Sequence, residues 1–130
     1  AVIGDSTFAH SGITGLINAA YNGRHGLVIV LDNGTTAMTG MQPNPFSGQR
    51  IDHSESFQLD YEKLAAAVGI AEENYRMVDA YKRDDIENAI TELREKSGLS
   101  LLVVEGTCVI LKQKQKKLER KQKEKARSVA

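Results

Sequence analysis

Residues 27–34 read Leu27-Val28-Ile29-Val30-Leu31-Asp32-Asn33-Gly34, and this stretch decides the fold class. Its first five residues are all apolar and rich in β-branched side chains, which is typical of a parallel strand covered on both faces. The turn-forming residues that follow end the strand. The stretch therefore predicts a buried strand whose carboxyl end carries an acid and an amide.

A similar arrangement precedes this strand. Apolar Val2 and Ile3 lead into Gly4-Asp5-Ser6, and Asp5 lies 28 positions before Asn33. Between the two, apolar residues recur at helical spacing from position 11 to position 22, which predicts a helix with one buried face. That face comprises Ile13, Leu16, Ile17, Ala20 and Tyr21. A strand, a crossover helix and a parallel strand would bring Asp5 and Asn33 to one edge of a sheet, where open α/β folds bind ligands.

The rest of the chain continues this alternation. The order of the elements predicts an α/β protein with a mainly parallel sheet and right-handed crossovers. A long polar segment rich in Gly, Pro, Asn and Ser interrupts them, and such a segment in a compact domain is usually functional. The expected elements are a loop over 34–57, a helix over 60–68, a strand around 76–78, a helix from 84 to Gly98 and a strand over 99–105.

Composition limits the possible classes of protein. The 130 residues, 41% of them apolar, suit one domain with a sizeable core. The sequence has no apolar run long enough to cross a membrane and no signal-peptide pattern, so we expect a cytoplasmic protein with no membrane partner. Cys108 is the single cysteine, which excludes an internal disulfide and a cysteine-held iron–sulfur cluster within this sequence.

The zero net charge hides an asymmetry. Residues 112–127 carry nine Lys or Arg against two Glu, so residues 1–111 are acidic. We expect a globular domain over 1–111 and a basic tail over 112–130, with the sequence being part of a longer polypeptide. The tail suits a solvated linker or helix better than a nucleic-acid or acidic-partner site, because no aromatic residues interleave with its charges.

The two turns suggest a metal site. Mg²⁺ takes oxygen ligands and keeps waters and substrate phosphates in its shell, so the Asp5 carboxylate, the Asn33 amide oxygen and a backbone carbonyl would suit a metal diphosphate. Each turn also has a purely structural explanation. Ser6 or Ser11 would cap a helix, and Asn33-Gly34 would supply left-handed turn conformations.

The quoted residues also carry a resemblance. The segments that carry it are Gly4-Asp5-Ser6-Thr7-Phe8, His10-Ser11-Gly12-Ile13, Gly15 to Ala19, and Leu31-Asp32-Asn33 with Thr35 to Gly40. Together they resemble the thiamine-diphosphate-binding domain of 2-oxoacid:ferredoxin oxidoreductases, and most closely its indolepyruvate branch. The resemblance is dense over 1–48 and looser over 51–111. It implies a three-layer thiamine-diphosphate-binding fold with helices on both faces of the sheet.

The resemblance implies a ligand set. Asp5, Asn33 and the main-chain oxygen of Thr35 would bind Mg²⁺, and the remaining residues would approach the diphosphate or wrap the thiazolium end. His10 would contact diphosphate or substrate, or would make only a structural hydrogen bond. The implied cofactor-binding residues are Gly4, Asp5, Ser6, Thr7, His10, Asn33, Thr35, Thr36, Thr39 and Gly40.

The resemblance further implies a function. It is the CoA-dependent oxidative decarboxylation of a 2-oxo acid, with indolepyruvate or another arylpyruvate as substrate and ferredoxin as electron acceptor. A pyrimidine-binding domain or second subunit would complete the site, and iron–sulfur clusters would lie elsewhere in the parent protein, so this segment alone would not turn over. The alternatives are another thiamine-diphosphate-dependent decarboxylase or synthase, and a non-catalytic scaffold or nucleic-acid-binding domain that uses the tail.

Overall fold

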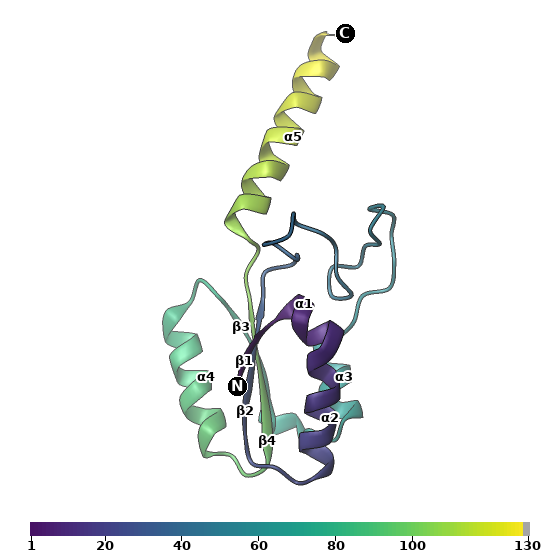
Figure 1. Cartoon of the computed structure of the whole chain (residues 1–130). Helices are drawn as coiled ribbons and strands as arrows, with labels where there is room; N and C mark the ends of the chain where they lie inside the picture. The colour runs from purple at the N-terminus through teal and green to yellow at the C-terminus, as the bar shows by residue number, and fades with distance from the viewer. Residues whose placement is uncertain (129–130) are drawn as a thin grey trace.

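The computed structural model describes residues 1–128 and consists of a sheet, its covering helices and a protruding helix (Figure 1). The long segment between β2 and α3 has no regular element, as the sequence predicts. The elements are β1 (Val2–Gly4), α1 (Asp5–Thr7), the π-helical η1 (Phe8–Gly12), α2 (Ile13–Tyr21), β2 (Gly26–Asp32), α3 (Tyr61–Ala67), the 3-10 turn η2 (Glu72–Asn74), β3 (Tyr75–Asp79), α4 (Arg83–Glu95), β4 (Leu99–Glu105) and α5 (Val109–Ser128).

The described strands form one parallel sheet in the order β1-β2-β4-β3. The register places Ile3 beside Val30 and Val30 beside Val103, so the carboxyl ends of β1, β2 and β4 lie along one edge. The sheet is parallel throughout because helical crossovers connect its strands. The predicted α/β class and the predicted parallel sheet are confirmed.

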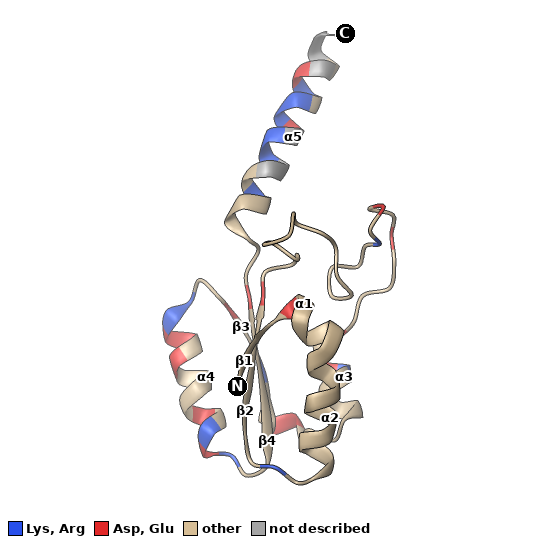
Figure 2. Cartoon of the chain, viewed as in Figure 1, with Lys and Arg blue, Asp and Glu red and all other residues tan. Residues whose placement is uncertain are grey.

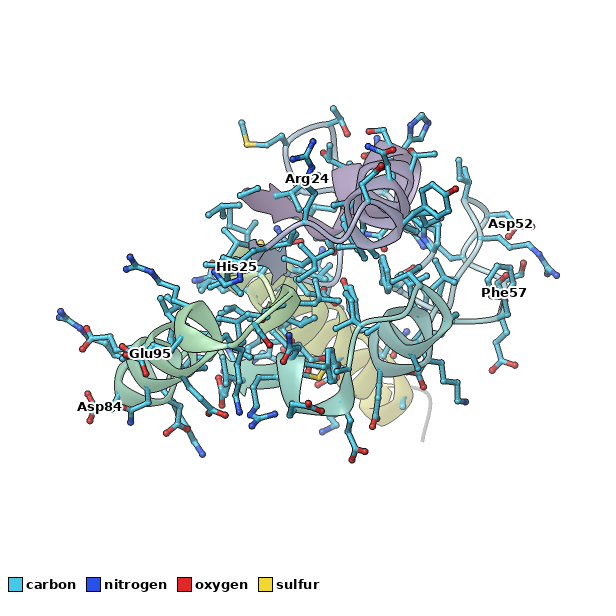
Figure 3. All side chains as sticks on the ribbon, turned by 90° about the horizontal axis from the view of Figure 1, so that it is seen from below. Arg24, His25, Asp52, Phe57, Asp84 and Glu95 are labelled. Atoms are coloured by element: carbon cyan, nitrogen blue, oxygen red, sulfur yellow. The ribbon has the colours of Figure 1, made fainter. Side chains whose placement is uncertain are left out.

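Helices cover both faces of the sheet, which makes three layers (Figure 1). On one face α2 and α3 pack over Val30, Leu101 and Val103. On the other, α4 packs over Leu102 and Val104. Figure 3 shows the layers end on, with Asp84 and Glu95 of α4 on one side and Asp52 and Phe57 of the long loop on the other. The expected three-layer arrangement is confirmed.

The first helical stretch begins earlier than its apolar pattern predicts. The predicted start near position 11 is wrong, because α1, η1 and α2 follow one another without a break from Asp5. Gly4 is the extended residue before the helix, with φ −77° and ψ 153°. The burial of Phe8 draws this extra turn onto the sheet. The predicted buried face is also partly wrong, since Ile17 and Tyr21 are exposed.

α5 projects from the end of β4 away from the layers (Figure 1). Lys and Arg predominate along the part of its ribbon that Figure 2 colours by residue type. It starts at Val109, a few residues before the predicted start of the basic tail, and the division into a domain and a tail remains a prediction. Within residues 1–128, no helix is both long enough and apolar enough to span a bilayer.

Candidate functional site

Asp5 is the central residue of the predicted site. It is the first residue of α1, directly after β1, and only 3% of its surface is exposed. The backbone N–H of Ser6 donates to its Oδ1 at 2.8 Å, and Asn44 Nδ2 donates to its Oδ2 at 3.0 Å. Asp5 is therefore held by a hydrogen bond on each carboxylate oxygen, at the carboxyl edge of the sheet.

A second buried carboxylate lies beside Asp5. Asp32 ends β2, and its Oδ1 accepts a hydrogen bond from the N–H of Gly34 at 2.8 Å. Burial raises the pKa of Asp5 above its usual value, hydrogen bonds from Asn44 and Ser6 oppose this, and the nearby charge of Asp32 raises the pKa further. Neither carboxylate belongs to any ion pair among the described residues. The sequence pattern places Asp32 only in the turn after the strand and does not predict it as a site residue.

Asn33 and Thr35 form the turn that follows β2. The side-chain oxygen of Asn33 accepts a hydrogen bond from the N–H of Thr35 at 3.1 Å, and its backbone oxygen accepts one from Cys108 at 3.0 Å. Thr35 is buried, and its hydroxyl donates to the carbonyl of Gln42. The turn is thus tied both to the end of β4 and to the long loop, and one lone pair of the Asn33 amide oxygen stays available to a ligand.

The loop after β2 returns to the start of the first helix. The Thr36 hydroxyl donates to the Ser6 hydroxyl at 2.8 Å, although the two residues are 30 positions apart. This contact joins the two predicted halves of the site. Gly4 and Thr7 flank Asp5 and Ser6 on the surface, and a Cβ added at Gly4 would meet nothing within 4 Å.

Three predicted residues do not join this group. Thr39 and Gly40 are exposed at the loop tip, where the Thr39 hydroxyl bonds to the side chain of Gln42. Gly40 has φ +124°, a conformation that requires glycine. His10 is exposed on η1, and its side chain makes no hydrogen bond to the other site residues in the described chain. Their roles in cofactor binding stay predictions.

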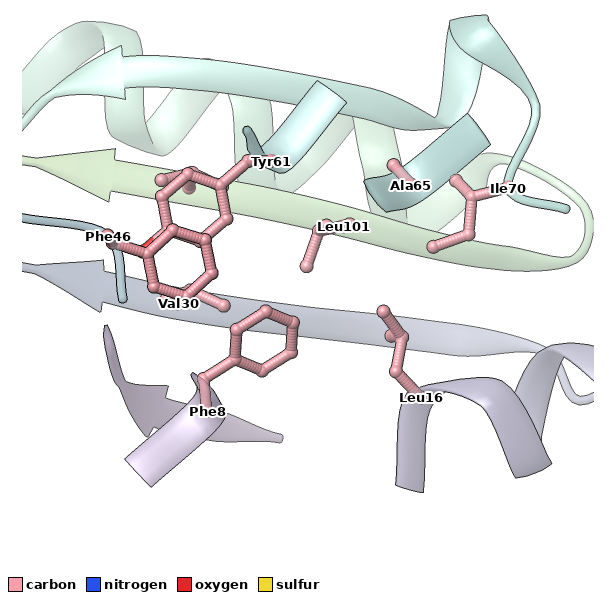
Figure 4. Close-up of a cluster of buried hydrophobic side chains, with 9 residues drawn as sticks. Phe8, Leu16, Val30, Phe46, Tyr61, Ala65, Ile70 and Leu101 are labelled. Carbon is pink, nitrogen blue, oxygen red and sulfur yellow. The ribbon is translucent and has the colours of Figure 1, made fainter. Parts of the chain in front are cut away.

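Asn44 and an aromatic stack hold the loop in place, and neither was predicted from the sequence. Asn44 Oδ1 accepts a hydrogen bond from the N–H of Phe46 at 2.9 Å. Phe46 stacks on Tyr61 with ring centroids 3.9 Å apart and an interplanar angle of 4°, and Phe8 lies 6.0 Å from Phe46 (Figure 4). An asparagine in a proline-rich loop carries no signal of its own, so the sequence pattern could not have identified it.

An acidic cleft of about 370 Å³ opens beside the predicted site, between α3 and strands β4 and β3. Burial, with the charges of Glu62, Asp60 and Glu105, raises the pKa of Tyr75 there to about 12. The Tyr61 hydroxyl is buried near Asp32 and has no hydrogen-bond partner among the described residues, and burial is the main cause of its raised pKa. No residue of the predicted ligand set lines this cleft, but Asp32 does, so the cleft adjoins the predicted site.

The donor groups around Asp5 suit a hard divalent cation. The predicted set combines one carboxylate, one amide oxygen and one backbone oxygen, and Mg²⁺ is usually bound by few protein oxygens together with substrate phosphates. Among the described residues, no three His, Cys, Asp or Glu side chains cluster closely enough to hold a metal by themselves. The residues present therefore fit a metal that a phosphate ligand helps to hold, and they do not form an all-carboxylate cage.

Comparison with known proteins agrees with this arrangement. Residues 1–104 match the family described as "Thiamine pyrophosphate enzyme, C-terminal TPP binding domain". This match spans β1 to β4 and includes every residue of the predicted site.

Curated relatives share one name, "Indolepyruvate oxidoreductase subunit IorA". The protein of Thermococcus kodakarensis is 40% identical over 112 residues, which are 86% of this chain and 17% of that protein. The protein of Pyrococcus horikoshii is 38% identical over 122 residues, or 94% of this chain and 18% of that protein. The protein of Methanothermobacter thermautotrophicus is 47% identical over 70 residues, or 52% of this chain and 11% of that protein. The chain thus spans less than a fifth of the length of these relatives.

Proposed function

Because this chain belongs to the family of C-terminal TPP-binding domains of thiamine pyrophosphate enzymes, we propose that it holds the diphosphate end of thiamine diphosphate through Mg²⁺. Asp5, the side chain of Asn33 and the main-chain oxygen of Thr35 are the proposed metal ligands. Gly4, Ser6, Thr7 and the loop residues up to Gly40 are proposed to lie along the cofactor.

One observation carries this proposal. Asp5 is a buried carboxylate at the carboxyl edge of a parallel sheet, beside a second buried carboxylate, Asp32. Burying two acids without a cation is unfavourable, and the described chain contains no ion pair to either of them. A divalent cation would offset this cost, and its free coordination positions would go to phosphate oxygens.

The residues of the chain have defined tasks in this proposal. Asp5 supplies charge to the metal, and the Asx turn of Asn33 presents an amide oxygen beside it. The bond between Thr36 and Ser6 closes the loop over the first turn of the helix, whose free N–H groups favour phosphate. When bound, thiamine diphosphate supplies the nucleophilic carbon and the electron sink that decarboxylation of a 2-oxo acid needs.

Calorimetric titration of the chain with thiamine diphosphate tests the assignment. We expect saturable binding with Mg²⁺ and none after chelation, and we expect Asp5→Ala to abolish it while circular dichroism stays unchanged. His25→Ala is the control, because His25 lies next to the opposite end of β2 and touches nothing in the site. Binding that needs neither Mg²⁺ nor Asp5 would contradict the proposal.

At the level of the whole protein, we propose a 2-oxoacid oxidoreductase that acts on indolepyruvate or another arylpyruvate. The names of the relatives support this substrate class. This wider proposal includes coenzyme A, ferredoxin, iron–sulfur clusters, and a pyrimidine-binding domain or second subunit that completes the site. Reduction of ferredoxin by the full-length assembly, dependent on indolepyruvate and CoA, is the expected result. Release of the aldehyde without electron transfer would instead indicate a non-oxidative decarboxylase.

A further inference from the structure

We propose that Asn44 is a positioning residue of the cofactor site, whose side-chain amide holds the Asp5 carboxylate in the orientation in which it binds Mg²⁺. This inference rests on the proposed function and extends it to a residue in the long loop. Asn44 lies 39 positions from Asp5 in sequence, and the hydrogen bond between them is buried.

The geometry divides the two oxygens of Asp5 between two donors. Ser6 N–H occupies one position on Oδ1 and Asn44 Nδ2 occupies one on Oδ2, at 2.8 and 3.0 Å. Two donors on opposite oxygens prevent the carboxylate from rotating about its terminal bond. Each oxygen keeps a further lone pair, which is the position left for a cation.

Asn44 is itself fixed on all sides. Its Oδ1 accepts from Phe46 N–H at 2.9 Å, its backbone oxygen accepts from Ser47 N–H at 2.8 Å, and Phe46 is stacked on Tyr61. Because Phe46 N–H needs an acceptor and Asp5 needs a donor, only one orientation of the amide satisfies both. The aromatic core therefore determines the direction of the amide N–H.

The chemical type of the donor also matters. A Lys or Arg in this position would neutralise Asp5 and compete with a metal for it. A neutral amide orients the carboxylate and leaves its charge to the cation, in the way that outer-shell groups orient metal ligands in proteins. Asn44 thus suits a carboxylate that is meant to bind a metal better than one that serves only the fold.

The test compares Asn44→Ala with Gln58→Ala in calorimetric titrations of the whole chain with thiamine diphosphate and Mg²⁺. Gln58 Nε2 donates to the carbonyl of Phe46 at 2.7 Å, so its loss loosens the same loop without touching Asp5. We expect affinity to fall by about tenfold in Asn44→Ala, which is the usual size of an outer-shell effect, and to change by less than about twofold in Gln58→Ala. Equal losses would overturn the proposal, because they would reduce Asn44 to a loop anchor.

Metal selectivity supplies a readout that a purely structural role would not move. Mg²⁺ demands near-ideal octahedral geometry whereas Ca²⁺ tolerates irregular shells, so a misoriented Asp5 should impair binding with Mg²⁺ more than with Ca²⁺. Asn44→Asp keeps an acceptor for Phe46 N–H but replaces the donor to Asp5 with a carboxylate that repels it, so this variant retains the loop anchor and removes the orienting bond. We expect the ratio of cofactor affinity in Mg²⁺ to that in Ca²⁺ to fall in both variants, and an unchanged ratio would overturn the proposal.

The same titrations separate this inference from the proposed function. Wild-type chain that binds cofactor without Mg²⁺, or that binds equally well after Asp5→Ala, would overturn both. Binding that depends on Mg²⁺ and Asp5 but is unaffected in Asn44→Ala would overturn the role of Asn44 alone.

Discussion

The two faces of the sheet bury different kinds of structure. On one face, the site-side core combines the first helical stretch, α3, strands β2 and β4, and two residues outside regular elements, Phe46 of the long loop and Ile70 after α3. On the other, the α4-side core consists of Ala89, Leu93, Leu102 and Val104, which all come from regular elements. The site-side core contains Phe8, Leu16, Val30, Phe46, Tyr61, Ala65, Ile70, Leu101 and Val103.

Because of this difference, we expect the packing of the site-side core, but not that of the α4-side core, to affect the predicted cofactor site. Phe46 is two residues from Asn44, which contacts Asp5, so a change in the site-side core reaches the predicted ligands through a short path. Leu93 and Ala89 of the α4-side core have no such path, because they lie on α4, on the opposite face of the sheet from Phe46. We therefore expect mutations of similar cost on the two faces to differ in their effect on cofactor binding.

The largest expected effects come from large-to-small substitutions in the two cores. Phe46→Ala should destabilise the protein by about 3–5 kcal/mol and Leu93→Ala by about 2–5 kcal/mol, because both side chains are buried. In Phe46→Ala the affinity for Mg²⁺ and thiamine diphosphate should also fall by about tenfold, since Asn44 loses its anchor. In Leu93→Ala the affinity of the folded protein should be unchanged.

Chemical denaturation measures the free energy of unfolding of both variants, and calorimetry on the folded protein measures cofactor affinity. If Leu93→Ala lost as much affinity as Phe46→Ala, the distinction between the two faces would break down.

Two glycines in the first helical stretch give a sharper comparison. A Cβ at Gly12 would lie 2.9 Å from side-chain carbons of Ile3 and Phe8, whereas one at Gly15 would meet nothing within 4 Å. We expect Gly12→Ala to destabilise by roughly 1–3 kcal/mol through overpacking. Gly15→Ala should stabilise by up to about 1 kcal/mol, because alanine favours helix. Thermal unfolding of both variants checks the opposite signs, and equal signs would mean that the site-side core tolerates extra volume.

Asp5 and Asp32 form a buried acidic pair, so we expect removal of one of the two charges to stabilise the metal-free protein. Burial and the neighbouring Asp32 raise the pKa of Asp5 in the folded state, so folding favours its protonated form. Stability should therefore fall as pH rises from the unfolded pKa of Asp5, about 4, through the raised folded pKa. Asp32→Asn removes the repulsion and should stabilise the protein by roughly 1 kcal/mol at pH 7, with no gain at pH 3.

Denaturation at both pH values with a chelator present measures this effect. A gain of equal size at pH 3 and pH 7 would show that the packing of the new amide, and not charge repulsion, is responsible.

The smallest expected effect concerns the helix starts on the two faces. Asp60 Oδ1 accepts a hydrogen bond from the N–H of Lys63 at 3.0 Å at the start of α3, whereas Lys82 makes no side-chain cap at the start of α4. Asp60→Ala should lower the melting temperature by a few degrees at pH 7, while Lys82→Ala should leave it nearly unchanged.

The Asp60 effect should depend on pH. The cap lowers the pKa of Asp60, so its contribution is present above the unfolded pKa of about 4 and is lost as pH falls through the lowered folded value. Asp60→Asn should keep the cap at both pH values, and calorimetric melting curves at pH 7 and pH 2 compare the three proteins. An equal loss in Asp60→Ala at both pH values would exclude the charged cap as the cause.

Much of the fold was predictable because it depends on local pattern. The continuous apolar run at 27–31 and the helical spacing in α4 each reflect interactions within a few residues, although α4 ends at Glu95, three residues before the predicted stop at Gly98. The early start of the first helix was not predictable, because it depends on the burial of Phe8 against residues far along the chain.

The sequence by itself determined the order and type of the elements and the placement of Asp5 and Asn33 at one edge of the sheet, because periodicity and crossover geometry are local rules. Tertiary structure alone decided that Asn44 bonds to Asp5 across 39 positions. This contact depends on the path of an irregular loop, which the stacking of Phe46 on Tyr61 determines. Such a path leaves no periodic trace in the sequence, because non-local packing sets it.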